Sequence, residues 1–205
     1  LTDYSFPVLF VLLTLTALYS FDVLLVKHYL TEHEAGLYAA ASLIGKIVFF
    51  ATLSIAMVMF PKVAESYERK SADHVKKVLN TSLLFILFMS LGIFAFYLFF
   101  PQFVVLALFG KNYLEIAPIL WLFALLYGLF SFIYSLSMYN LSIHRYTFVY
   151  FIILMNLIEI GLLVLYHNTL RSVLTVVVGV MALLLAYLLW YTYSYNLEEG
   201  MRSSA

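Results

Sequence analysis

Three ionisable side chains lie inside long apolar stretches of the sequence, where chemistry is least expected. Asp22, Lys46 and Glu159 each stand in a run made mostly of Leu, Ile, Val and Phe. Hydrocarbon solvates charges poorly, so such a residue predicts a charged partner, a water-filled path or a functional site. With a helical rise of about 1.5 Å per residue, all three fall roughly 10–15 Å from the outer ends of their helices. We therefore expect them to share one layer of the protein.

Polar residues accompany two of these charges at helical spacing. Tyr38, Ser42 and Lys46 follow one another at intervals of four, which places them on one helix face. Asn156 precedes Glu159 by three residues, and a later helix carries a face of Tyr127, Ser131, Tyr134 and Ser135. These faces are typical of helices that border a hydrated interior.

A purely structural interpretation of the same residues stays open. Asp22 and Lys46 would then be a buried ion pair that fixes the register of two helices and touches no substrate. The Tyr and Ser faces would be helix–helix contacts closed by hydrogen bonds.

The composition defines the elements that must position these residues. The chain has 205 residues, of which 65% are hydrophobic and 11% charged, whereas a soluble domain carries about 25% charged residues. Apolar runs of about 20 residues are long enough to cross a bilayer as helices. We predict an all-α polytopic membrane protein, a single bundle over 1–205 with six transmembrane helices at 6–29, 36–60, 78–100, 119–139, 147–166 and 173–193.

Two of the segments that connect the predicted helices are long enough for their structure to be predicted. Pro61 is expected to end the second helix, so we predict a cytoplasmic loop over 61–77, with Ser71 and Asp73 as a helix start signal. The segment 101–118 is too short to span and is predicted to lie at the interface.

The basic residues predict an orientation. Seven Lys and Arg residues fall in segments on the side of the N-terminus and three on the opposite side. Because Lys and Arg are retained in the cytoplasm, both termini are predicted to be cytoplasmic, in a multi-pass protein of the plasma or inner membrane.

Several classes of function are disfavoured by the residues. Eleven acids balance eleven bases, which argues against nucleic acid as a partner. There is no cysteine, and the five histidines lack the spacing of a metal site within a helix. No nucleophile, phosphate-loop or metallohydrolase motif is visible. We expect no enzyme, no metal and no cofactor.

Two sequence passages carry a resemblance to a known family. The first is DVLLVKHYL at 22–30 with EAGLYAAASLIGK at 34–46, closing on VMFPKVAE at 58–65. The second is LFGKNYLEIAPIL at 108–120, and a polar break at 140–145 adds a weaker third. In these passages the chain resembles the C-terminal half of polysaccharide-biosynthesis flippases. These are the O-antigen or lipid-linked oligosaccharide translocases of the multidrug/oligosaccharidyl-lipid/polysaccharide exporter superfamily.

The resemblance implies one lobe of a two-lobe, twelve-helix transporter that works by alternating access. The missing wall would be an N-terminal six-helix lobe, upstream or on another chain. The substrate would be a polyprenyl-diphosphate-linked glycan, such as a lipopolysaccharide precursor, handled among membrane lipids. Lys46 is the best match for a contact to its diphosphate, and Asp22, Tyr38, Ser42 and Glu159 would help to solvate the head group.

A coupling ion and two rival functions belong to the same expectation. Asp22 or Glu159 would take up the proton or sodium ion that drives reorientation. The alternatives are a cation-coupled multidrug or small-molecule antiporter of the same superfamily, and a non-transporting membrane scaffold in a glycan-assembly complex.

Overall fold

The computed structural model describes residues 2–197, with side chains from Val8 onward. Leu1 and the tail 198–205, for which the charge count predicts a cytoplasmic side, lie outside the described residues. Within that range every regular element is helical. The elements are α1 (Thr2–Leu18), α2 (Phe21–Tyr29), α3 (Glu32–Glu68), α4 (Ala72–Phe99), α5 (Pro101–Leu108), the 3₁₀ helix η1 (Lys111–Ile119), α6 (Leu120–Ser142), α7 (Phe148–Leu165) and α8 (Leu170–Tyr193).

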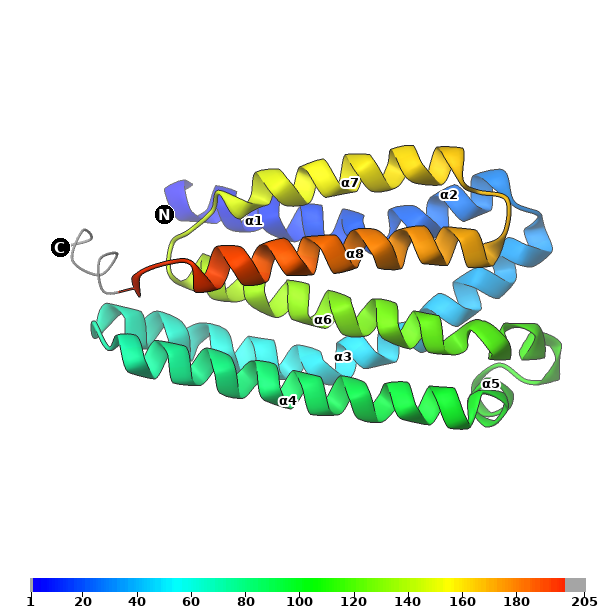
Figure 1. Ribbon diagram of the computed structural model, residues 1–205, viewed down its shortest axis with the longest axis horizontal. Coiled ribbons are helices and arrows are strands. Elements are labelled where there is room, and N and C mark those ends of the chain that lie inside the picture. The colour runs from blue at the N-terminus through cyan, green and yellow to red at the C-terminus, as the bar shows by residue number, and fades with distance from the viewer. Residues whose placement is uncertain (1, 198–205) are drawn as a thin grey trace.

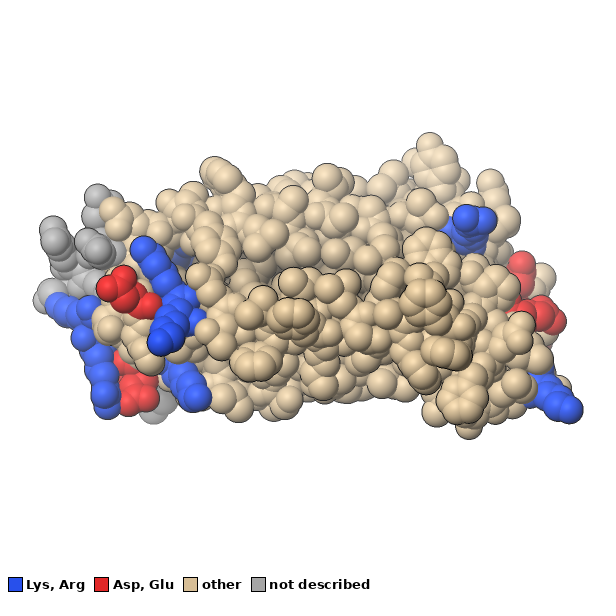
Figure 2. Space-filling model, turned by 60° about the horizontal axis from the view of Figure 1, so that its bottom comes forward, with Lys and Arg blue, Asp and Glu red and all other residues tan. Residues whose placement is uncertain are grey.

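Six helical segments are long and apolar enough to cross a membrane, which confirms an all-α polytopic membrane protein. They run side by side, and the start of α1 and the end of α8 lie at the same end of the bundle (Figure 1). Figure 2 shows Lys, Arg, Asp and Glu gathered at both ends of the molecule, with a band of uncharged residues between them. A band of this kind is what hydrocarbon requires of a protein surface. The six segments are Val8–Tyr29, Glu32–Glu68, Ala72–Phe99, Lys111–Ser142, Phe148–Leu165 and Leu170–Tyr193.

The central element is α6, which packs against α3, α4 and α8. In its most apolar stretch 67% of the residues are buried, against 22% to 39% in the other five segments. Its sequence suits this place, because Gly128 and several serines lie among its aromatic and aliphatic residues, and small residues let helices approach closely in a membrane. The contact between α3 and α6 is the most extensive in the bundle.

The α3–α6 contact depends on a glycine. A Cβ atom built on Gly45 would lie 2.6 Å from Tyr127 Cδ2 and 2.9 Å from Phe123 Cβ, closer than real Cβ atoms come to other groups. Gly92, in the middle of α4, has no such neighbour within 4 Å.

We therefore expect Gly45→Ala to lower the free energy of unfolding by about 1–3 kcal/mol, the usual cost of overpacking a closed interface. Thermal unfolding of the full-length protein in detergent measures this. Gly92→Ala, the matched control in another membrane-spanning helix, should leave the transition temperature unchanged or slightly higher. Equal transition temperatures for the two variants would show that the α3–α6 interface can open to admit a methyl group.

The loop predicted over 61–77 is wrong, because nearly all of it is helical. Helix α3 continues through Pro61 to Glu68, and α4 already begins at Ala72. A proline inside a helix removes one donor and crowds the preceding turn, and a helix can continue where the surroundings tolerate that loss. Pro61 is exposed, so solvent can reach the backbone oxygen that loses its donor at this position. The connection is a tight turn, in which Lys70 adopts a left-handed φ of 54°.

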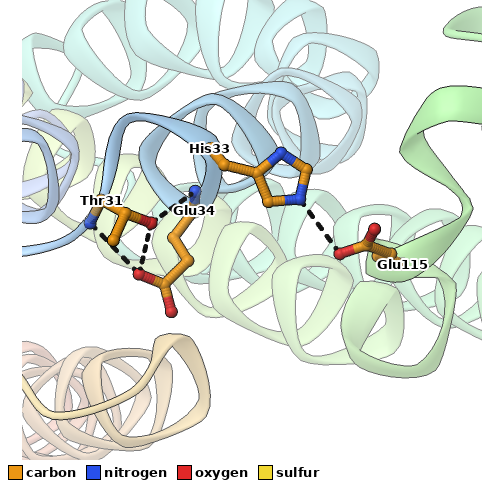
Figure 3. A network of polar contacts seen from close by, with 4 residues as sticks. All are labelled: Thr31, His33, Glu34 and Glu115. Carbon is orange, nitrogen blue, oxygen red and sulfur yellow. Dashed lines mark hydrogen bonds and ion pairs between the residues drawn. The ribbon is translucent and has the colours of Figure 1, made fainter.

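The opposite end of the bundle is fixed by local polar contacts (Figure 3). Thr31 caps α3 in a reciprocal capping box with Glu34, which satisfies two amide donors at the helix start. His33 Nε2 lies 3.2 Å from Glu115 Oε2 of η1. This pair joins the start of α3 to the segment 101–118, which the structure folds into the two short helices α5 and η1.

At the end of the bundle where α1 starts and α8 ends, Arg145 joins the α6–α7 turn to α8. Its guanidinium carbon lies 3.8 Å from the ring centroid of Tyr191 and 4.0 Å from that of Tyr195. The same group donates to the backbone oxygen of Tyr191 at 3.1 Å. A guanidinium between two aromatic faces is a strong cation–π arrangement, so Arg145 fixes the C-terminal end of α8 against the turn.

Candidate functional site

The first membrane segment is broken in its middle, where the sequence analysis expects one continuous helix. Helix α1 ends at Leu18 and α2 begins at Phe21, with Ser20 in a non-helical conformation. Upstream, Thr14 Oγ1 donates to the backbone oxygens of Phe10 and Val11, a contact that bends helices. Broken helices inside a membrane occur where the backbone is buried in protein or borders a cavity.

Asp22 lies at the start of α2, directly after this break. Only 1% of its surface is exposed. Its Oδ1 accepts the amide hydrogen of Val23 at 2.7 Å, and its Oδ2 accepts from the hydroxyl of Tyr38 at 2.7 Å. The positive end of the α2 dipole favours an acidic group in this first turn. The carboxylate of Asp22 is therefore fixed by an amide of α2 and by the Tyr38 hydroxyl of α3.

Glu159 of α7 approaches Asp22 from the other side. It is 1% exposed, and within the described chain neither carboxyl oxygen has a hydrogen-bond partner. It is close enough to Asp22 for the two groups to interact electrostatically. One turn earlier, Asn156 donates to the backbone oxygen of Thr14 at 3.3 Å while its own oxygen stays unpaired. Buried polar atoms normally find partners, so this group of acceptors is suited to receive a proton or a cation.

Ser42, the next residue of the predicted α3 face, contacts α6. Its Oγ lies 2.7 Å from the hydroxyl of Tyr127, and further along Thr52 donates to Ser131 Oγ at 2.8 Å. Tyr38 and Ser42 are both 1% exposed or less. The polar faces of α3 and α6 therefore meet each other here. Tyr38 and Ser42 are used here in contacts between helices, as the packing interpretation expects, and their role in solvating a head group stays a prediction.

Lys46 and Asp22 do not form an ion pair, which corrects that expectation. The Tyr38 hydroxyl takes the place beside Asp22, while the Lys46 ammonium lies 5.1 Å from the ring centroid of Tyr19. The described ion pairs are those of His33 with Glu115 and of Arg69 with Glu65. Lys46 is therefore a half-buried cation beside the break in the first segment, with an aromatic face as its neighbour.

An aromatic cluster surrounds this position. Tyr19 packs edge-on against Phe130 at 5.0 Å, Phe130 against Phe49 at 4.9 Å, and Phe49 against Tyr134 at 5.3 Å. Rings in such contacts form a rigid apolar surface with a polar hydroxyl at either end. Many aromatic residues lie within the spans of the sequence, but these four are far apart along the chain, and only the packing of the α1–α2 break, α3 and α6 brings them together.

The face of α3 that carries Lys46 is open on one side. Leu43, Ile47 and Phe50 are 57%, 41% and 62% exposed, and with Lys46 they follow the three-to-four residue spacing of one helix face. Three cavities of the described chain, of about 460, 390 and 410 Å³, lie elsewhere, and none of them is lined by Lys46, Asp22 or Glu159. Among residues 2–197 no three His, Asp or Glu side chains are placed to hold a metal ion.

A bundle of six spanning helices, with a broken first segment and ionisable groups beside the break, defines a transporter-type membrane protein. The model of the family described as "Polysaccharide biosynthesis protein" matches residues 1–118, from α1 into η1. The chain belongs to this family and is a polysaccharide-related, multi-pass membrane protein. No match was found among curated proteins or among solved structures.

Proposed function

We propose that the chain forms one lobe of a flippase that moves a lipid-linked oligosaccharide or polysaccharide precursor across the membrane by alternating access. The observation that carries this proposal is Lys46, an ammonium group beside an aromatic cluster and without a carboxylate partner in the described chain. A cation attracts a diphosphate, and aromatic faces accept the apolar faces of sugar rings. The family match supports a glycan-related substrate.

The second lobe would pack opposite Lys46. Leu43, Ile47 and Phe50 leave this face of α3 uncovered, so the polar head group would travel between it and a facing six-helix bundle. The lipid tail would stay in or beside the bilayer. In this proposal the chain corresponds to a C-terminal lobe of an inner-membrane protein, with both termini in the cytoplasm and no catalytic step of its own.

Asp22 and Glu159 are proposed to supply the coupling site for a proton or a sodium ion. Two buried carboxyl groups, Asp22 beside the break and Glu159 on α7, are close enough to interact electrostatically, and Glu159 has no hydrogen-bond donor in the described chain. Ion binding there would change the contact between α2, α3 and α7, since Tyr38 links Asp22 to α3. The same observation favours a cation-coupled small-molecule antiporter as the second candidate.

The decisive measurement is translocation in proteoliposomes that hold the full-length protein. A polyprenyl-diphosphate-linked oligosaccharide is placed in one leaflet, and its arrival in the other is read by an impermeant sugar oxidant. Glycan-lipid transport supports the flippase. Drug transport without glycan-lipid transport would favour the antiporter, and transport of neither substrate would favour a scaffold.

Labelling of the exposed α3 face provides a second test. The given chain has no cysteine, so an introduced cysteine is the only one in this lobe, and any cysteine of the facing lobe is first replaced by serine. We expect Ile47→Cys to react with an impermeant maleimide and to be protected by the glycan lipid. The control, Leu87→Cys on α4, is similarly exposed at 39% against 41% and should stay unreactive because lipid covers it. Indifference of Ile47→Cys to the glycan lipid would contradict a path along this face.

A further inference from the structure

A groove between α3 and α4 combines a basic end with an apolar length. It has a volume of about 460 Å³ and lies beside the turn that joins the two antiparallel helices. Lys62 of α3 and His74 and Lys77 of α4 line it near the turn. Val58 and Phe85 line it further into the bundle, together with small hydroxyl and aliphatic side chains.

The two ends are spaced as in an amphipathic molecule. Ser54 and Lys62 are eight residues apart on α3, and Lys77 and Phe85 are eight residues apart on α4, roughly 12 Å in each case. Both helices therefore place their basic residue at the same end and extend the same distance into the apolar band. Figure 2 shows Lys and Arg side chains gathered at the end of the molecule where α3 and α4 meet.

The basic residues of the groove are available to bind an anion. Neither Lys62 nor Lys77 takes part in an ion pair in the described chain, and the nearby acid Glu65 is bound by Arg69 at 2.7 Å. Phe85 is 61% exposed and Val58 is 55% exposed, so the apolar part of the groove opens on the flank that hydrocarbon covers.

We infer that this groove binds an anionic phospholipid, with the headgroup phosphate between Lys62 and Lys77 and an acyl chain along Val58 and Phe85. Each feature serves one part of such a molecule. Two lysines complement the phosphate charge at the depth of the headgroups, and the apolar length excludes water from the chain. Such a lipid would lie on the outside of the lobe in a regulatory or structural role. Its binding is independent of what the protein transports.

Native mass spectrometry of the full-length protein in mixed phosphatidylglycerol and phosphatidylcholine tests this binding. We expect the unchanged protein to retain phosphatidylglycerol preferentially. Lys62→Gln with Lys77→Gln should weaken that retention roughly thirty-fold, the effect of removing two lysines from a headgroup site. The matched control, Lys70→Gln with Lys76→Gln, removes the same charge at the same end but outside the groove, and should change retention little.

A second pair of variants tests the apolar part of the groove. Phe85→Ala should weaken retention of the lipid, whereas Phe88→Ala, which is 66% exposed on the same helix and outside the groove, should not. If the Lys62/Lys77 and Lys70/Lys76 double variants lost phosphatidylglycerol retention equally, the lipid would be held by diffuse charge attraction, and the inferred binding in the groove would be wrong. Competition by glycerol phosphate at the concentration of the lipid would also overturn the inference, because it would reveal a site for the anion alone.

Discussion

Replacing Lys46 with methionine is expected to reduce glycan-lipid translocation by roughly ten- to a hundred-fold, the loss of one hydrogen bond to a charged group. Methionine keeps the length of the side chain and its contact with Tyr19, but it removes the only cation near the aromatic cluster of the described chain. The variant should unfold at a temperature close to that of the unchanged protein, because Lys46 forms no ion pair in the described chain and methionine can still pack on the ring of Tyr19. The translocation assay in proteoliposomes measures the effect.

Two controls distinguish a substrate contact from a general effect of charge. Lys27→Met removes an exposed lysine at the end of α2 and should transport normally. Lys46→Arg keeps the charge and should retain part of the activity, since an arginine also binds phosphate. Full transport by a folded Lys46→Met protein would show that the head group takes another path.

Replacing Glu159 with glutamine is expected to abolish the dependence of transport on an ion gradient without lowering the stability of the fold. A charge at Glu159 has no hydrogen-bond donor to stabilise it, and burying an unpaired charge is costly. Glutamine has nearly the same shape and carries no charge, so we expect a transition temperature at or above that of the unchanged protein. Transport under an imposed proton or sodium gradient measures the loss of coupling.

Two further variants, each measured for both stability and gradient dependence, separate the role of Glu159 from that of Asp22. Asp22→Asn should also lose the gradient dependence, but with a lower stability because Asp22 accepts two hydrogen bonds. Glu32→Gln, at an exposed position in the first turn of α3, is the neutral control. Coupling that survives in Glu159→Gln would assign Glu159 to the packing of α7 and leave Asp22 as the one candidate.

The fold class was predictable from the sequence, because apolar runs of about 20 residues form membrane-spanning helices. The contacts of Lys46 were less predictable. Its depth follows from counting residues, but its neighbour depends on how α3 is rotated about its axis. A hydroxyl at Tyr38 competes with the ammonium for Asp22, and only the packed bundle shows that the hydroxyl is the nearer partner.

The two helix boundaries that were predicted wrongly have a common reason. Pro61 is a strong signal for a helix end, yet its exposed position lets α3 continue. The break at Tyr19 and Ser20 contains neither glycine nor proline and so gave no signal. It depends on Thr14, which bends the preceding turn, and on Asp22, whose carboxylate accepts an amide of the new helix. Such side-chain competition for backbone groups is hard to recognise in a sequence.

The unbroken length of α3 has a mechanical consequence. Its 37 residues make a rod roughly 55 Å long, nearly twice the thickness of the hydrocarbon core. Tyr38, Lys46 and Lys62 all lie on this one helix, at the proposed ion site, the proposed head-group site and the proposed lipid groove. We therefore expect a change in the tilt of α3 to move all three proposed sites together, and the close contact of Gly45 with α6 to limit that tilt.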